Sequence, residues 1–283
     1  MDNGSVSNMA QRVDPRLRSA SLASTPSHSH AHSHAHADRH RRCLRGASAS
    51  GPTQRRGVSA SASAASALEV RDLTYMPASA SRPLLNGVTF DLAPGRIGLI
   101  FGPSGSGKST LLNVLAGFCT SYDGEVVLQS GSAGRAMRDV GVVFQFPERY
   151  FVGNTIMEEL SFGWRHSNSA EVRSEFVANL QSVLRVTGLS HLPLDQKLAH
   201  LSGGYQRRVA IAVQLLRKPS VLLLDEPTAG MDLPSIQALC ATLVKVKQRS
   251  AVLVVSHDTE LLLGIADDVW EMKSGGYLAG KMR

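Results

Sequence analysis

The residues with the clearest chemical capacity lie in a glycine-rich segment that ends in a lysine and two hydroxyl residues. Its members are Gly102, Pro103, Ser104, Gly105, Ser106, Gly107, Lys108, Ser109 and Thr110. The segment follows the apolar run 97–101 and opens a stretch with helical spacing. Glycines let main-chain N–H groups wrap phosphates, Lys108 is placed to span the β- and γ-phosphates, and the Ser109 hydroxyl suits Mg²⁺. This pattern predicts a phosphate-binding loop between a strand and a helix.

Two adjacent acidic residues, Asp225 and Glu226, follow the apolar run 221–224. Asp225 is placed to hold Mg²⁺, usually through water, and Glu226 to orient and deprotonate an attacking water molecule. An acidic pair at the end of a strand is common by itself. Downstream of a phosphate-binding loop it is the expected partner, so the two segments together predict hydrolysis of a nucleotide phosphate.

Short strands and helices alternate around these segments from residue 68 onward. Apolar and polar residues alternate, as in half-buried antiparallel strands, near 68–70 and 88–92. The apolar runs that are typical of strands buried on both faces are 97–101, 140–144, 221–224 and 251–255. Helical spacing runs through 172–183 and 205–216. The pattern predicts an α/β fold with a mostly parallel core sheet, an N-terminal antiparallel part and ligands at the strand ends.

The charge of the chain is unevenly distributed. The 283 residues carry a net charge of +7, and 43% of them are hydrophobic. Residues 1–67 hold nine Arg, no Lys and three acids, a net of +6, which leaves 21 bases and 20 acids, a net of +1, for the rest. A nearly neutral domain argues against nucleic acid as a partner. No apolar run approaches the roughly 18 residues that span a bilayer, so any membrane-spanning part belongs to another chain.

Residues 1–67 have the composition of a disordered leader. The segment is rich in Ser, Ala and Arg and poor in acids, and it lacks the apolar core of a secretory signal. It predicts a chloroplast transit peptide, with a mitochondrial presequence and a plain disordered tail as alternatives. Six histidines alternate with small residues at His28, His30, His32, His34, His36 and His40. They could hold a transition metal, or they are low-complexity sequence in a segment that is removed.

The segment Leu201–Arg208 reads LSGGYQRR, and Ser202 lies 23 residues before Asp225 (225 minus 202). It resembles the signature motif of ATP-binding-cassette (ABC) ATPases, with Tyr205 where that family usually has Gln. Physical chemistry supports the resemblance, because Ser202 can cap a helix whose first glycines, Gly203 and Gly204, expose N–H groups to an anion.

Further segments resemble the remaining motifs of that family in the same order. Gln145 resembles the Q-loop glutamine that contacts Mg²⁺ and the lytic water, and His257 resembles the switch histidine that contacts the γ-phosphate and Glu226. Asp232 resembles the acidic residue of the D-loop, and Tyr75 the aromatic residue that stacks on adenine. The resemblance implies ATP and Mg²⁺ as ligands. The catalytic residues that it implies are Lys108, Gln145, Glu226 and His257, and the residues toward Mg²⁺ are Ser109, Gln145 and Asp225.

The resemblance extends over residues 68–283 and implies one cassette with a helical subdomain at about 146–218. In this family the signature motif completes the ATP site of the opposite subunit. One cassette per chain therefore implies a dimer, either of two identical chains or with a related cassette.

The segments Phe146–Phe151 and Thr155–Trp164 resemble the corresponding region of energy-coupling-factor and cobalt-type importers. They also resemble the soluble plastid cassettes of plant subfamily I, one of which is linked to transition-metal homeostasis. We therefore expect a transporter ATPase on the stromal side of a plastid membrane that moves transition-metal ions or a small cofactor-type solute. The alternative is a soluble ATPase scaffold for iron–sulfur assembly. A cassette that acts on nucleic acid is disfavoured by the net charge of +1.

Overall fold

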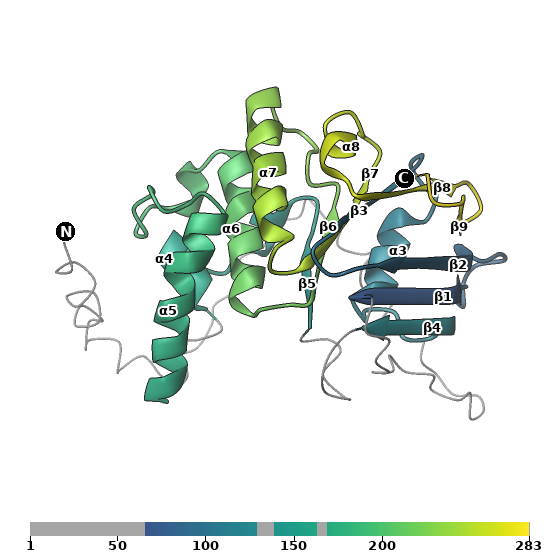
Figure 1. The fold of residues 1–283 in the computed structure, drawn as a ribbon, viewed down its shortest axis with the longest axis horizontal. Helices are drawn as coiled ribbons and strands as arrows, with labels where there is room; N and C mark the ends of the chain where they lie inside the picture. The colour runs from purple at the N-terminus through teal and green to yellow at the C-terminus, as the bar shows by residue number, and fades with distance from the viewer. Residues whose placement is uncertain (1–65, 129–138, 163–168, 283) are drawn as a thin grey trace, which may run out of the picture. The chain divides into compact units, whose positions relative to one another are not determined.

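A computed structural model describes residues 66–128, 139–162 and 169–282 (Figure 1). The predicted leader and its histidines lie outside these residues except for 66 and 67, as do Gly163 and Trp164. The N–H of Ala67 donates to the carbonyl of Leu92 at 2.7 Å. Sheet pairing therefore begins at the first residues that the structure describes.

A three-stranded antiparallel sheet forms the N-terminal part of the fold. Its strands, in spatial order, are β2 (Leu85–Leu92), β1 (Leu68–Tyr75) and β4 (Asp123–Leu128). Val70 pairs with Phe90 and Leu68 with Leu92, so the apolar residues that alternate along the two strands lie on one face. The predicted antiparallel part is confirmed.

The main sheet has six strands and carries the site. In spatial order they are β5 (Val140–Val143), β6 (Val221–Asp225), β7 (Ala251–Ser256), β3 (Ile97–Phe101), β8 (Asp268–Lys273) and β9 (Tyr277–Leu278). Neighbours run parallel except for β8 and β9. Every residue of β7 is buried, as expected of a strand that is covered on both faces. The predicted α/β fold with a mostly parallel core sheet is confirmed.

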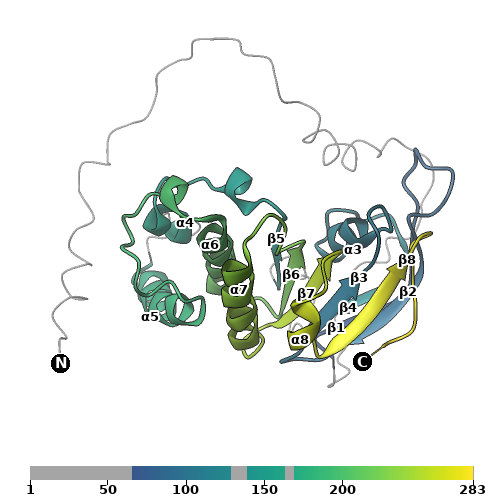
Figure 2. The same ribbon diagram turned by 90° about the horizontal axis from the view of Figure 1, so that it is seen from above.

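Two apolar clusters cover the two faces of this sheet. The main helices in them are α3 (Lys108–Leu115), α5 (Ala170–Val186), α6 (Gly203–Leu216) and α7 (Leu233–Val246). Leu222 and Leu224 of β6 pack with α5, α6 and α7, whereas Val221 and Leu223 pack with α3 and the antiparallel sheet. The alternation along β6 thus sends α6 and α3 to opposite sides of β5 and β6, as Figures 1 and 2 show.

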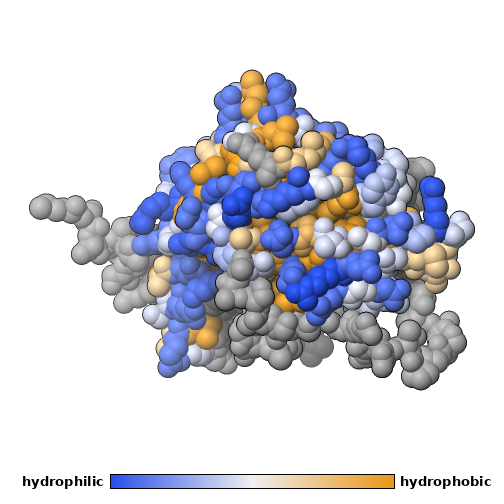
Figure 3. Space-filling model, turned by 45° about the vertical axis from the view of Figure 1, so that its right-hand side comes forward, coloured by the Kyte–Doolittle hydropathy of each residue, from blue (hydrophilic) through white to orange (hydrophobic). Residues whose placement is uncertain are grey.

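Shorter elements complete the helical side. They are α4 (Ile156–Ser161), α8 (Leu262–Ile265) and the 3-10 turns η3 (Pro147–Tyr150) and η4 (Leu198–His200). The helices predicted over 172–183 and 205–216 are confirmed as α5 and α6. On the face in Figure 3, hydrophilic residues cover most of the surface and apolar residues show between them. No helix in the described ranges combines the length and apolarity needed to cross a bilayer.

Candidate nucleotide-binding site

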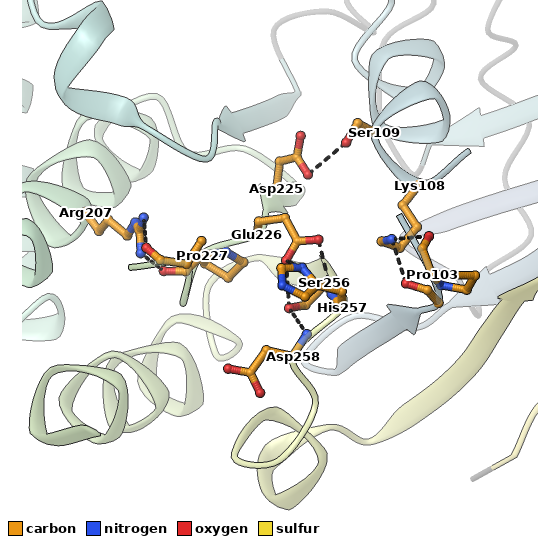
Figure 4. Close-up of polar contacts among 12 residues, drawn as sticks. Pro103, Lys108, Ser109, Arg207, Asp225, Glu226, Pro227, Ser256, His257 and Asp258 are labelled. Atoms are coloured by element: carbon orange, nitrogen blue, oxygen red, sulfur yellow. Dashed lines mark hydrogen bonds and ion pairs between the residues drawn. The ribbon is translucent and has the colours of Figure 1, made fainter. Parts of the chain in front are cut away.

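The loops that carry the predicted catalytic residues leave one edge of the parallel sheet (Figure 4). Strands β3 and β7 end together at the pair Phe101–Ser256, and β6 ends beside β7 at Asp225. Strand β5 runs parallel to β6 and ends one pair earlier. Because parallel strands share their carboxyl edge, the segments that follow all four strands meet there. Ligands of open α/β sheets bind at this edge.

The ammonium of Lys108 is buried at the start of α3 and is held by its own loop. Lys108 is 5% exposed, and its Nζ donates to the carbonyls of Gly102 at 2.8 Å and Pro103 at 3.0 Å. Burial lowers the pKa of this ammonium, while the carboxylates of Glu226 and Asp225 oppose the shift. The cation therefore lies within electrostatic reach of both predicted acidic residues.

Two glycines of the loop are required for different reasons. Gly107 has φ +109°, and a Cβ there would lie 2.7 Å from the carbonyl oxygen of Leu84. Gly105 has φ +79°, but a Cβ there would meet no atom within 4 Å. Conformation and close packing both demand glycine at 107, whereas conformation alone demands it at 105. The space beside Gly105 is open.

A hydroxyl and a carboxylate converge where the sequence predicts Mg²⁺. Ser109 Oγ donates to Asp225 Oδ1 at 3.2 Å (Figure 4). Ser109 lies in the first turn of α3 and Asp225 ends β6, so two separate elements aim hard oxygen atoms at one place. Oxygen donors of this kind are those that Mg²⁺ prefers, and the residues present therefore fit the ion.

The carboxylate of Glu226 is fixed by β7 and the residue after it. It accepts from Ser256 Oγ at 3.0 Å and from the His257 N–H at 3.1 Å. His257 Nδ1 lies 2.9 Å from Glu226 Oε2, with the imidazole 56% exposed and the carboxylate side chain 12% exposed. Glu226 has φ +45°, an uncommon value for a residue other than glycine that concentrates at functional sites. The structure thus joins the predicted base to the predicted switch histidine.

Two predicted residues lie at this edge without a shown contact to the acids. Gln145 follows β5, and its carbonyl oxygen accepts from Arg207 Nη2 at 2.8 Å. Asp232 occupies the N-cap position of α7, where its side chain forms no capping hydrogen bond within the described ranges. Their roles toward Mg²⁺ and ATP stay predictions.

The signature residues begin α6, on the other side of the sheet from α3. Ser202 takes the N-cap position, but in the described part of the chain its side chain makes no capping hydrogen bond, contrary to the expected cap. Gly204 packs against α7, where a Cβ would lie 3.1 Å from Ser235, while Gly203 has open space. The phosphate-binding loop and the signature residues of one chain are therefore not brought together.

Tyr75 is in the core. It is 7% exposed at the end of β1, pairs with Leu85 and belongs to the cluster on the α3 face. The next residue, Met76, is 54% exposed. Stacking of Tyr75 on adenine stays a prediction, and it would require a ring that is almost entirely covered to present a face to the base.

Sequence reasoning missed two buried polar residues, Arg207 and Glu159. Arg207 is 5% exposed, and its guanidinium donates to main-chain carbonyls after β5 and β6. Glu159 is 7% exposed, and its carboxylate accepts from the N–H groups of Val152 and Gly153 at 2.8 and 2.7 Å. For Arg207 a signal existed, because it falls on the helical stripe that also contains Gly204.

A family model described as ABC transporter matches residues 85–229. The Arabidopsis thaliana protein "ABC transporter I family member 11, chloroplastic" is 42% identical over 226 residues, which cover 76% of this chain and 81% of that protein. The "Cobalt import ATP-binding protein CbiO" of Rhodobacter capsulatus is 36% identical over 203 residues, or 69% of this chain and 71% of that protein.

Solved structures of ABC transporter cassettes have the same fold. The structure of cbiO1 from Clostridium perfringens, described as part of the ABC transporter complex cbiONQ, matches with a TM-score of 0.68 and 27% identity, covering 77% of this chain and 88% of that one. A nucleotide-free ATP-binding cassette from an ABC transporter matches with a TM-score of 0.65 and 25% identity, over 77% and 91%. The motifs, the fold and these matches agree that the chain belongs to the ABC transporter family, as one of its ATP-binding cassettes.

Proposed function

We propose that this chain is the Mg²⁺-dependent, ATP-hydrolysing subunit of a multi-chain organellar transporter. The observation that carries the proposal is the convergence, at one sheet edge, of the Lys108 ammonium, the Ser109–Asp225 pair and the Glu226–His257 pair. These groups supply the charge neutralisation, the metal donors and the base that phosphoryl transfer to water requires.

Glu226 acts as the general base. Its carboxylate takes the proton of the attacking water at an oxygen whose direction is fixed by Ser256 Oγ and the His257 N–H. The exposed imidazole of His257, bonded through Nδ1 to Glu226, is placed to contact the γ-phosphate while it holds the base in position.

Lys108 and the metal donors stabilise the phosphates. The Lys108 ammonium, held by two carbonyls of its loop, has a third donor for the oxygens of the β- and γ-phosphates. Ser109, Asp225 and Gln145 would hold Mg²⁺, which would supply positive charge against the charge that develops on the phosphate.

A second cassette completes each site. Because α6 and α3 lie on opposite sides of the sheet, Ser202, Gly203 and Gly204 serve the nucleotide of a partner cassette. The partner is a second copy or a related chain, and two nucleotides are enclosed between the two subunits.

A membrane-spanning subunit docks on the segment after β5. A groove of about 110 Å³ lies there between β5, η3 and α6. Its apolar wall is formed by Val142, Val143, Phe144, Pro147, Tyr150, Phe151, Ala210 and Val213. Tyr150 of this wall is exposed, and so are the nearby Phe146 and Val152, as expected of a contact surface. The groove and these exposed side chains favour a docked membrane subunit. So does the description of cbiO1 as part of a multi-chain transporter complex.

The leader and the relatives support the proposed compartment and cargo. A plastid address agrees with the composition of residues 1–67 and with the chloroplastic relative. Transition-metal ions or a small cofactor-type solute are the proposed cargo, because one relative is named for cobalt import.

Two measurements test this function. The purified chain should hydrolyse ATP with Mg²⁺ and stop when EDTA removes the ion. Tagged chain purified in mild detergent from chloroplasts should bring down a membrane-spanning protein. Recovery from mitochondria instead would overturn the plastid assignment. Recovery of soluble iron–sulfur assembly proteins alone would replace transport with the scaffold function.

A further inference from the structure

Within the described residues, the hydrogen bonds of the buried Arg207 side chain all go to main-chain oxygens. It lies in the second turn of α6 and is 5% exposed. Its Nη2 donates to the carbonyls of Gln145 at 2.8 Å and Ala229 at 2.7 Å, and its Nη1 donates to the carbonyl of Pro227 (Figure 4). One guanidinium thus joins α6 to two loops of the catalytic edge.

No carboxylate forms an ion pair with Arg207 among the described residues. Its Nε is buried without a hydrogen-bond partner there, and burial lowers the pKa of the guanidinium, an effect that Glu148 opposes. An arginine in this setting is weak evidence for stability, since a packed apolar residue of similar volume often serves as well. The acceptors of its three hydrogen bonds indicate a role other than stability.

The three carbonyls belong to segments that the proposed mechanism uses. One carbonyl belongs to Gln145, which is itself a predicted catalytic residue. The second belongs to Pro227, which directly follows Glu226, and the third to Ala229, which begins the segment that resembles the D-loop. Arg207 itself is three residues after Gly204 of the signature motif. A displacement of α6 therefore moves the donor of all three bonds.

We propose that Arg207 is a positioning residue that sets Gln145 and Glu226 in their hydrolytic arrangement and ties that arrangement to the position of the signature helix. A planar guanidinium suits this task, because its donors diverge in one fixed plane and reach two loops at once. The inference rests on the proposed ATP hydrolysis.

Arg207→Met tests it in the full-length chain. Methionine keeps much of the volume and removes all three bonds. We expect kcat for Mg²⁺-ATP to fall about 10- to 100-fold, since small misplacements of catalytic groups cost rates of this order, with KM changing less than threefold. Three main-chain carbonyls lose their donor, so thermal unfolding should occur at a lower temperature, and kcat is measured well below it. Arg207→Lys, which keeps the charge without the fork, should recover part of kcat.

Arg217→Met is the matched control. Arg217 is exposed at the C-cap of α6, and among the described residues its side chain bonds none of the three carbonyls. We expect its kcat to stay within twofold of the wild type.

A kcat of Arg207→Met within twofold of the wild type would overturn the positioning role, as would a fall matched by Arg217→Met. If Arg207→Met does not fold, a kcat of folded Arg207→Lys equal to the wild type overturns it as well. Absence of ATP hydrolysis by the wild-type chain would instead refute the proposed function.

Discussion

The catalytic edge of the parallel sheet and the segment 146–162 are built in opposite ways. At the edge, strands in register deliver residues such as Asp225 and Ser256, so main-chain pairing determines where the loops that follow begin. In the segment 146–162, side chains of α4 shape the loop before it, where Glu159 binds two main-chain N–H groups and Glu158 Oε2 accepts from the Asn154 N–H at 2.8 Å. The difference indicates a rigid chemical centre beside a surface whose shape depends on a few carboxylates.

Glu226→Gln should have the largest effect, and only on the edge. Glutamine keeps acceptors for Ser256 and His257 but cannot take a proton, so kcat should fall about 100- to 1000-fold. ATP should remain bound and hold two chains together, which size-exclusion chromatography with light scattering measures. Glu175→Gln, at an exposed pair with Lys218, is the control and should behave as the wild type. A monomer with ATP that turns over normally would refute the sandwich arrangement.

Lys108→Ala should weaken triphosphate binding. Loss of the side-chain cation predicted for the β- and γ-phosphates should lower ATP affinity about 10- to 100-fold, as charge-assisted bonds contribute about 1.5–3 kcal/mol each. Isothermal titration with ATP and with AMP checks this, and the AMP affinity should change less. Equal affinity of variant and wild type for ATP would contradict the assignment of the loop.

Glu159→Ala should disturb the segment 146–162 and spare the edge. The N–H groups of Val152 and Gly153 lose their acceptor, at a cost of about 1–3 kcal/mol in the free energy of unfolding. Intrinsic ATP hydrolysis of the folded variant should stay within twofold, while recovery of the membrane subunit falls. The half-buried helix-start residue Glu158, changed to Ala, should cost less than about 1 kcal/mol in the free energy of unfolding. If Glu159→Ala loses kcat but still recovers the membrane subunit, Glu159 serves the hydrolytic site and not the segment 146–162.

Tyr75→Leu should have the smallest effect on function, because the ring belongs to the core and not to either region. We expect a loss of about 1–3 kcal/mol in unfolding free energy and less than a threefold change in ATP affinity. The exposed neighbour Met76, changed to Ala, should shift stability by less than about 0.5 kcal/mol. A tenfold loss of ATP affinity in Tyr75→Leu would establish the stacking role.

The two regions also differ in how far sequence predicts them. The fold and the strand-end positions follow from apolar runs and motif spacing, because parallel register leaves few arrangements for Lys108, Asp225 and Glu226. Burial of Tyr75 follows from its alternation with Leu73, a signal that the motif resemblance outweighed. The bonds of Arg207 could not be predicted, since they depend on how closely α6 packs onto two loops that are distant in sequence.

If Lys108 binds phosphates as proposed, its two bonds to carbonyls of its own loop let the protein distinguish nucleotides by their number of phosphates. Two of the three N–H donors of the ammonium are held by these carbonyls, so the ammonium is fixed in place and a phosphate oxygen can accept from the third. ADP and ATP carry a β-phosphate that can do so, whereas AMP and adenosine do not. Under the proposed function, Lys108 selects nucleotides by the length of the phosphate chain, and AMP is expected to compete poorly with ATP.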